Sequence, residues 1–470
     1  MARTSLLPPQ TTDKPAPKRL VSIDAYRGLV MLAMASSGLA IKSTWERLSA
    51  KPEWLEQQTS GAVEAWKIAS YQLSHVDWVG CGFWDMIQPS FMFLVGVAMP
   101  FSYARRAAQG DSGLRRFAHM LFRAIVLVGL GVFLQSKSQS QTNFIFTNVL
   151  AQIGLGYPFV YLLVGRNWKS QLAAIILILT GYWAFFVYAP IPETDTQNTI
   201  AYLAEQTEKA DEKNKPKFDH EQFTGFAAHW NKHTNAGAYV DRQLLNHFPG
   251  SEEPWQEQRF WTNAGGYVTL NFIPSIATML FGLMAGQLLR SNSSKKRKIG
   301  VLLGSGLCCF IIVLAADTTI WPIAVEGANW TVCPTVKKIW TPTWAVFSAG
   351  WAFWMLAGFY WFVDVLGFKK LVFPLAIVGM NSIAFYLMAG LIKGWVENQS
   401  GIHLTTLDIL IRDACANIEA LKSFSWEKGF MYYLRSDEFA WNLVARRAFA
   451  VFLLWLIALW MYRRKIFLRV

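Results

Sequence analysis

Long apolar segments restrict the fold of this sequence more than any other feature, because roughly 20 mostly apolar residues can cross a bilayer as a helix. Only 16% of the 470 residues are charged, whereas water-soluble domains carry about 25%. The sequence therefore predicts an all-α polytopic integral membrane protein of about ten transmembrane helices. The expected spans are 24–42, 82–104, 117–135, 144–165, 171–190, 268–289, 299–317, 343–366, 371–392 and 448–462.

The basic residues between these segments predict the orientation. If the N-terminus is cytoplasmic, the inner segments hold 23 of the 44 Lys and Arg residues within about 72 residues, and the outer segments spread the rest over about 200. Cytoplasmic loops are the ones enriched in Lys and Arg, so both termini are expected in the cytoplasm. Arg446 and Arg447 are exceptions on the outer side. This pattern accounts for the net charge of +13, and no nucleic-acid partner is expected.

The chain is expected to contain two groups of five spans, joined by a long extracytoplasmic loop. The first 20 residues lack the apolar core of a cleaved signal peptide. The five cysteines form no metal-binding spacing, so no metal is expected. Cys333 and Cys415 both fall outside, where a disulfide is chemically permitted. The expected parts are a disordered cytoplasmic tail (1–23), spans one to five with outer loop 43–79 (24–190), the long loop (191–267), and spans six to ten with outer loop 393–447 (268–470).

Asp24 and Arg27 lie three residues apart at the inner start of the first span, so they share a helix face and can pair. One interpretation is a structural ion pair that anchors the helix at the interface. The other is that Arg27 binds the phosphates of an anionic cofactor from the cytoplasm.

His75 precedes the second span at its outer mouth, and Asp85 follows ten residues later. A carboxylate inside a membrane span is costly and is functional by default. Histidine can act as a base or a nucleophile near neutral pH, and a carboxylate can orient it. An interfacial histidine with no catalytic role is the alternative. Pro89 is expected to kink the helix and free backbone carbonyls.

Asn381 and Ser382 lie within the ninth span. A buried amide is costly unless it bonds to a partner, so Asn381 either ties helices together or lines a polar site. Asp364 is expected at the inner interface, near Lys369 and Lys370.

Several segments share a further pattern: Arg19–Met31; His75 with Trp78, Gly80, Asp85, Pro89, Phe91, Phe93 and Gly96; Ala238–Arg242; Ile273–Ala277; Gly282–Gly286; Lys338–Thr341; Ser348–Trp351; and Gly379–Ser382. Together they resemble the heparan-α-glucosaminide N-acetyltransferase family of transmembrane acyltransferases. The resemblance implies transfer of an acetyl group from cytoplasmic acetyl-CoA to an amino sugar or glycan across the membrane. His75 corresponds to the family's active-site histidine, as base or acetyl carrier.

The resemblance also suggests roles for other residues. Asp85 would support His75, and a polar slot for the pantetheine arm would be lined by Asp85, Asn381 and Ser382. The CoA phosphates would bind Arg27, Arg105, Arg106 and Arg123, and a sugar would stack on Trp78, Trp84 or Trp230. A homodimer is implied too. The animal enzyme has a further N-terminal span, which favours a bacterial relative in the cytoplasmic membrane.

Two features differ from the family pattern, and two other functions stay open. The outer end of the first span carries Ser36-Ser37-Gly38 where the family often has Asn, and a long insert (43–74) precedes His75. A permease would use Asp85, Asp364 and Asn381 along its pathway. A non-catalytic membrane scaffold would use 191–265 as a binding loop.

Overall fold

The computed structural model describes residues 20–137, 139–209, 223–245, 247–248, 265–319, 331–416 and 441–468, without the side chains of 441–442 and most of those in 404–416. Within these ranges the regular structure is helical, apart from two isolated β-bridges. Seven helical segments are long and apolar enough to cross a membrane, and an eighth is a bent pair. The prediction of an all-α polytopic membrane protein is therefore confirmed. The count of ten spans stays a prediction.

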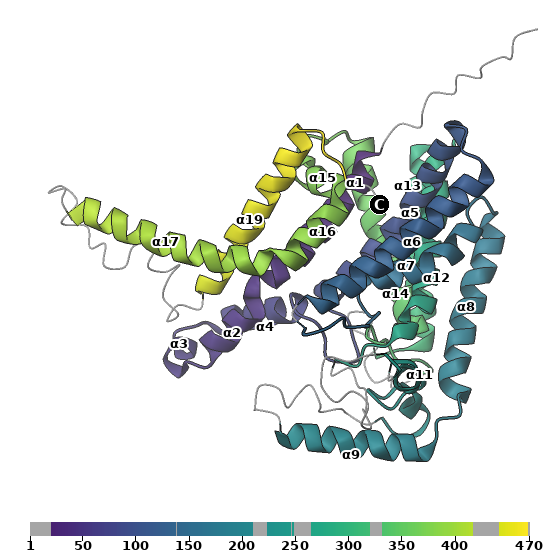
Figure 1. Cartoon of the computed structure of the whole chain (residues 1–470), viewed down its shortest axis with the longest axis horizontal. Coiled ribbons are helices and arrows are strands. Elements are labelled where there is room, and N and C mark those ends of the chain that lie inside the picture. Colours follow the sequence, from purple (N-terminus) through teal and green to yellow (C-terminus); the bar gives the residue numbers. More distant parts are fainter. Residues whose placement is uncertain are drawn as a thin grey trace, which may run out of the picture.

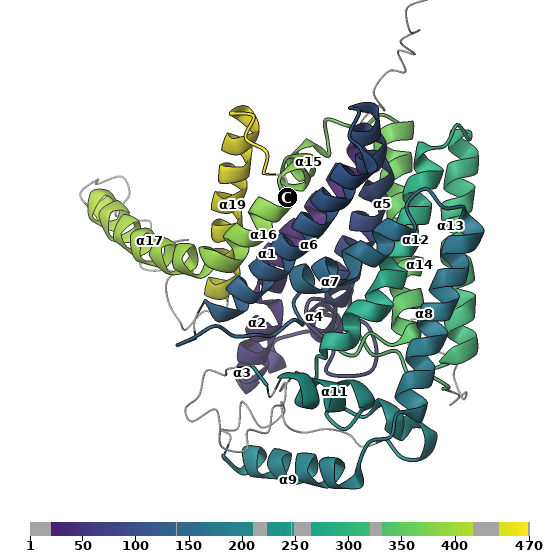
Figure 2. The same cartoon turned by 45° about the vertical axis from the view of Figure 1, so that its right-hand side comes forward.

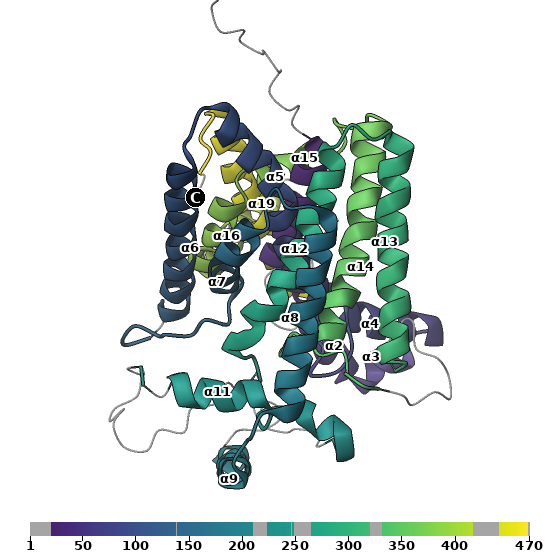
Figure 3. The same ribbon diagram turned by 90° about the vertical axis from the view of Figure 1, so that its right-hand side faces the viewer.

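The bundle consists of helices that run between two ends of the molecule (Figures 1 and 3). They are α1 (Val21–Ser36), α5 (Ile87–Ala108), α6 (Gly113–Ser136), α7 (Val149–Leu162), α8 (Trp168–Tyr188), α12 (Phe272–Arg290), α13 (Lys295–Ala316), α14 (Pro342–Phe359), α15 (Phe373–Met380), α16 (Ser382–Leu391) and α19 (Trp441–Arg463). The start of α1 and the end of α19 lie at the same end, which is the upper end in Figure 1. We call it the inner end, following the predicted orientation.

The opposite, outer end carries shorter elements that cover the bundle (Figure 2). Five short helices lie at this end and connect the longer ones. The helices concerned are α2 (Ile41–Ser49), α3 (Pro52–Glu56), α4 (Ser60–Gln72), α9 (Glu193–Lys209) and α11 (Ala236–Leu245). A further helix, α17 (Lys393–Ala416), projects away from the bundle.

Glycines let the central helices approach backbone to backbone. A Cβ on Gly282 of α12 would lie 1.9 Å from the carbonyl oxygen of Phe93 on α5, and one on Gly96 would lie 1.9 Å from that of Met279. Such distances exclude any side chain at these positions. Small residues are what membrane helices use to pack closely, because lipid supplies no hydrophobic drive for association. Close helix packing thus explains Gly96 and Gly282 of the family-like pattern.

The structure changes three details of the sequence prediction. The first helix ends at Ser36, because residues 37–40 adopt left-handed backbone conformations. The expected span 371–392 is bent by 82° at Asn381, between α15 and α16. Pro89 lies in the first turn of α5, where its missing N–H is not needed, so it starts the helix and does not kink it.

Candidate functional site

The turn before α5 brings His75 and Asp85 into contact. The Nδ1 atom of His75 lies 2.7 Å from Oδ1 of Asp85. The other carboxylate oxygen, Oδ2, accepts hydrogen bonds from the backbone N–H groups of Val76 at 3.2 Å and Gly82 at 3.1 Å. Asp85 belongs to the 3₁₀ turn Phe83–Met86, which turns its side chain back toward residues 75–82. Three contacts are thus made within the single segment 75–85.

Lys337 is a third charged member of this cluster, and the sequence analysis did not identify it. Its Nζ atom lies 3.0 Å from Oδ1 of Asp85 and 3.0 Å from Nδ1 of His75. The two segments are joined by a β-bridge between Val79 and Val336 and by a hydrogen bond from the N–H of Gly80 to the carbonyl of Thr335. A residue 252 positions away from Asp85 is therefore delivered by backbone pairing.

Asp317, at the end of α13, holds the segment that carries Lys337. It is fully buried. Its Oδ2 atom accepts from the backbone N–H and the hydroxyl of Thr335, both at 2.8 Å, and Oδ1 accepts from the N–H and hydroxyl of Thr319. Four hydrogen bonds satisfy this buried carboxylate, as its burial requires.

The contacts fix the proton arrangement of the cluster. A carboxylate only accepts hydrogen bonds, so the 2.7 Å contact requires that Nδ1 of His75 carries the proton. The ammonium of Lys337 then donates to Oδ1 of Asp85, because a protonated Nδ1 cannot accept. The remaining lone pair of the imidazole is on Nε2. The His75 side chain is 51% exposed, while those of Asp85 and Lys337 are 2% and 7% exposed, so the cluster presents one reactive nitrogen above two buried charges.

Two more lysines lie beside this cluster, Lys232 and Lys338. Lys232 is buried, and the Lys338 ammonium lies 6.0 Å from the ring centroid of Tyr267. Burial, together with the positive charges of Lys232 and Lys337, lowers the pKa of Lys338 to about 8. The carboxylates of Asp77 and Asp85 partly oppose this shift. The mouth around His75 is consequently rich in positive charge.

The three candidate sugar-stacking tryptophans lie in different surroundings. Trp230 is fully buried and stacks on Phe186, with ring centroids 5.1 Å apart. Trp84 is buried as well. Trp78 is half-buried and donates from its indole N–H to the carbonyl of Trp230 at 3.0 Å. Among the three, Trp78 has the surface with which to meet a ligand.

The four candidate phosphate-binding arginines lie on α1, α5 and α6. Arg27 is 3.9 Å from Asp24, at the edge of an ion-pair distance. Arg106 contacts Asp111 and His119, and Arg105 is exposed. Arg123 packs over the ring of Tyr157 at 4.9 Å, and its buried Nε has no hydrogen-bond partner among the described residues.

Asn381 and Ser382 occupy the bend between α15 and α16. The Nδ2 of Asn381 donates to the carbonyl of Ile466 at 2.9 Å, and its Oδ1 accepts from the N–H of Leu468 at 3.1 Å. Its amide therefore ties the C-terminal segment to the helix bend. The structure does not bring it into contact with Asp85. Asp364, also outside the cluster, accepts from the N–H of Ser22 at 3.1 Å and so caps α1.

Other polar residues of the sequence pattern support the outer end. Arg242 pairs with Asp195 of α9 and donates to the carbonyl of His233. The neighbouring Asp241 accepts from the N–H of Thr269 at 2.8 Å. Burial raises the pKa of Asp241 to about 7. Cys333 is buried and forms no disulfide with a described residue, and the side chain of Cys415, its expected partner, lies outside the described residues.

The turn that carries His75 and Asp85 lies in a region that is similar to a known protein family. Residues 62–211 match the model of the heparan-α-glucosaminide N-acetyltransferase catalytic family. Over these residues the chain is similar to this family. It is 21% identical over 409 residues to the human heparan-α-glucosaminide N-acetyltransferase and 22% identical over 410 residues to the mouse protein.

These alignments cover 79% and 80% of the chain, and 52% and 54% of the human and mouse proteins. The chain therefore spans about half the length of the curated relatives it matches. His75 and Asp85 lie inside the family-matched region, and so do Arg105, Arg106 and Arg123. Lys337 lies beyond it.

A signal for Lys337 was present in the sequence. Lys337 and Lys338 follow a run of apolar and hydroxyl residues on the expected outer side, where basic residues are depleted. Two lysines directly before an apolar span on that side are unusual and therefore indicate a structural or functional role. The pattern gave no means of pairing them with Asp85, because only the β-bridge brings the segments together.

Proposed function

We propose that this protein transfers an acetyl group from acetyl-CoA to the amino group of an extracytoplasmic amino sugar or glycan, with His75 as the catalytic residue. The observation that carries the proposal is the cluster of His75, Asp85 and Lys337. It provides an exposed imidazole whose Nδ1 is held by a buried carboxylate. The human and mouse relatives are N-acetyltransferases by name, and an imidazole with a free Nε2 suits acyl transfer.

Two routes use Nε2 of His75. In direct transfer, Nε2 takes a proton from the acceptor amine as its nitrogen bonds to the thioester carbonyl; the C–S bond then breaks, and the CoA thiolate takes up the proton. In the two-step route, Nε2 attacks the thioester and releases CoA, and the amine then displaces the acetyl group from the imidazole. Both routes consume one acetyl-CoA and one amine and give one amide and one CoA thiol. Asp85 stabilises the positive imidazole that forms in either route.

Lys337 acts as a positioning residue in this scheme. Its ammonium and the imidazole N–H share Oδ1 of Asp85, while Oδ2 is occupied by two backbone N–H groups. The carboxylate is thereby fixed on all sides and cannot rotate away from His75. A buried Asp–Lys pair also leaves no uncompensated charge beneath the reacting groups.

The arginines toward the inner end are the proposed binding groups for the phosphates of acetyl-CoA. Arg105 lies 20 residues along the helical path from Asp85, which corresponds to about 30 Å. Arg123 lies ten residues into α6, about 15 Å from its inner end, so it is closer to the level of the site. Its unpartnered Nε suits a phosphate oxygen. We therefore rank Arg123 first among the cofactor-binding candidates.

The test is an acetyl-transfer assay with radiolabelled acetyl-CoA and purified protein. We expect CoA release that depends on glucosamine and is lost in His75→Ala, with the exposed His403→Ala as a matched control that retains it. Acid quenching and mass mapping of His75 distinguish the two routes, because only the two-step route leaves acetyl on the imidazole. Acetyl-CoA binding without turnover would redirect the search to other acceptors.

If the protein neither binds acetyl-CoA nor turns it over, the proposal is contradicted and a permease is favoured. A permease should also keep its melting temperature when acetyl-CoA is added, whereas an enzyme that binds acetyl-CoA is stabilised by it. The proposal further places the protein in a bacterial cytoplasmic membrane as a homodimer. Cross-linking in native membranes tests the dimer.

A further inference from the structure

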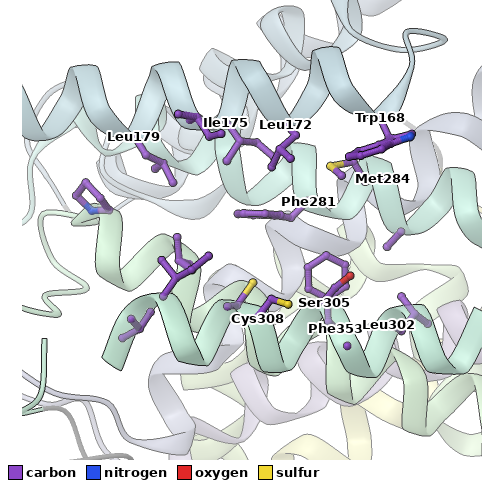
Figure 4. Close-up of a pocket in the computed structure, with 18 of the residues that line it drawn as sticks. Trp168, Leu172, Ile175, Leu179, Phe281, Met284, Leu302, Ser305, Cys308 and Phe353 are labelled. Atoms are coloured by element: carbon purple, nitrogen blue, oxygen red, sulfur yellow. The ribbon is translucent and has the colours of Figure 1, made fainter. Parts of the chain in front are cut away.

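A long apolar groove lies between α8 and α13 (Figure 4). In Figure 3, α13 lies on the side of the bundle opposite α6. Its volume is about 1290 Å³, larger than the roughly 300–1,000 Å³ of common small-molecule pockets. Leu172 and Ile175 of α8 form one wall, and Leu302 and Cys308 of α13 form the other. Phe281 of α12 lies at the floor between them. The lining is almost entirely hydrocarbon and therefore suits an apolar chain.

The groove extends along the membrane-spanning direction. Trp168 and Arg297 line it at the inner end, where α8 and α13 both begin. Val332 and Thr343 line it at the outer end. Since both walls are candidate membrane spans, the groove is within the thickness of the bilayer. Its occupant must come from the membrane.

The inner end of the groove is strongly positive. The two connections that flank it, 163–170 and 287–298, contain seven Lys and Arg residues and no Asp or Glu. Both walls also begin there as helices, capped by Asn167 and Ser294, so two positive helix ends point toward the same region. Arg297 is the cation that lines the groove itself.

We propose that this groove binds an anionic phospholipid, with its phosphate at Arg297 and its acyl chains along Leu172, Ile175 and Phe281. Basic pockets between transmembrane helices on the cytoplasmic side are the sites that recognise anionic headgroups. The apolar walls accept the acyl chains, and the positive inner end selects the headgroup. This site is separate from the proposed acetyl-transfer site and does not depend on it.

The experiment measures lipid binding to the full-length protein by native mass spectrometry, with phosphatidylglycerol and phosphatidylcholine of identical acyl chains. We expect phosphatidylglycerol to bind more tightly than phosphatidylcholine. Arg297→Glu should weaken phosphatidylglycerol binding by about 30-fold, because it changes the local charge by two and each charge near the headgroup contributes about fivefold. Arg115→Glu reverses an exposed charge on the far side of the bundle and should leave this affinity within about twofold.

A second variant tests the apolar part of the site. Ser305→Phe places an aromatic ring among the lining residues of α13 and should reduce binding of both lipids. Equal affinity for the two lipids, or equal losses in Arg297→Glu and Arg115→Glu, would overturn the proposal. The proposal would also be overturned if Ser305→Phe keeps its bound lipid but no longer dimerises, because the groove would then hold a second copy of the chain. Acetyl transfer is scored in parallel and tests the other proposal.

Discussion

The outer and inner ends of the bundle organise their charges in opposite ways. At the outer end, Asp85 and Lys337 are buried, come from segments 252 residues apart and are held by several hydrogen bonds. At the inner end, Arg106 meets Asp111 and His119 within 13 residues of sequence, and Arg105 is exposed. The first arrangement is rigid and depends on the whole fold. The second is local and screened by water, so it contributes little to stability.

The largest effect should follow removal of the shared carboxylate. Asp85→Ala leaves the buried Lys337 without its partner, and breaking a buried pair in this way costs about 3–5 kcal/mol. We expect loss of acetyl transfer by about 10³-fold or more, together with a lowered melting temperature. Asp85→Asn keeps the shape and should lose activity with less destabilisation. Asp77→Ala, an exposed carboxylate in the same turn, is the control; similar losses in both alanine variants would contradict the special role of Asp85.

Lys337 should matter for activity through its hold on Asp85. Lys337→Met is expected to lower kcat by about tenfold to 100-fold, the range of a typical acid–base contribution, with a smaller change in KM for acetyl-CoA. Lys337→Arg should recover part of the loss, because it keeps the charge. The matched control is Lys338→Met, the adjacent lysine. A double-mutant cycle with Asp85→Asn measures the coupling, and additive effects would show that Lys337 does not act through Asp85.

The inner arginines should show smaller, separable effects. Arg123→Ala is expected to raise KM for acetyl-CoA by about tenfold, equivalent to about 1.4 kcal/mol for a lost charge-assisted hydrogen bond. Arg105→Ala should change KM by less than about threefold, because the side chain is exposed at the end of α5. Steady-state kinetics with varied acetyl-CoA provide the comparison. A larger rise in KM for Arg105→Ala than for Arg123→Ala would place the cofactor phosphates nearer to the membrane surface.

The smallest effect concerns the pH dependence of the outer end. The raised pKa of Asp241, about 7 against an ordinary value of about 3.9, means that the folded protein binds its proton more tightly than the unfolded chain. This stabilisation is present below about pH 4 and is lost as the pH rises through 7. Asp241→Asn should therefore gain melting temperature relative to wild type between pH 5 and pH 8. A pH-independent difference would contradict the buried, proton-binding state of Asp241.

Much of the fold and part of the site could be predicted from the sequence. The apolar segments indicate the long helices directly, and the polar pair His75 and Asp85 is close enough in sequence to suggest contact. Trp230 could not be distinguished from a surface aromatic, because its burial depends on Phe186 from α8. The bend at Asn381 was not predictable, because it rests on hydrogen bonds to residues 466–468.

One of the two arginines that charge counting leaves on the outer side, Arg447, is held by long-range contacts of the same kind. Arg447 donates to the carbonyl of Ser37 at 3.0 Å, at the left-handed turn that ends α1. Its Nε also lies 4.0 Å from Glu397 of α17. These groups occupy fixed structural positions at the outer end, so charge counting alone gave them no role.

The central claim is that acetyl leaves acetyl-CoA on one side of the membrane and reaches an acceptor on the other through His75. The most direct measurement uses sealed proteoliposomes of uniform orientation, with labelled acetyl-CoA on the inner-end side and glucosamine only on the outer-end side. We predict labelled N-acetylglucosamine in the compartment that held the glucosamine, and none with His75→Ala. Product formed only when both substrates share one compartment, or formed equally by His75→Ala, would contradict the account.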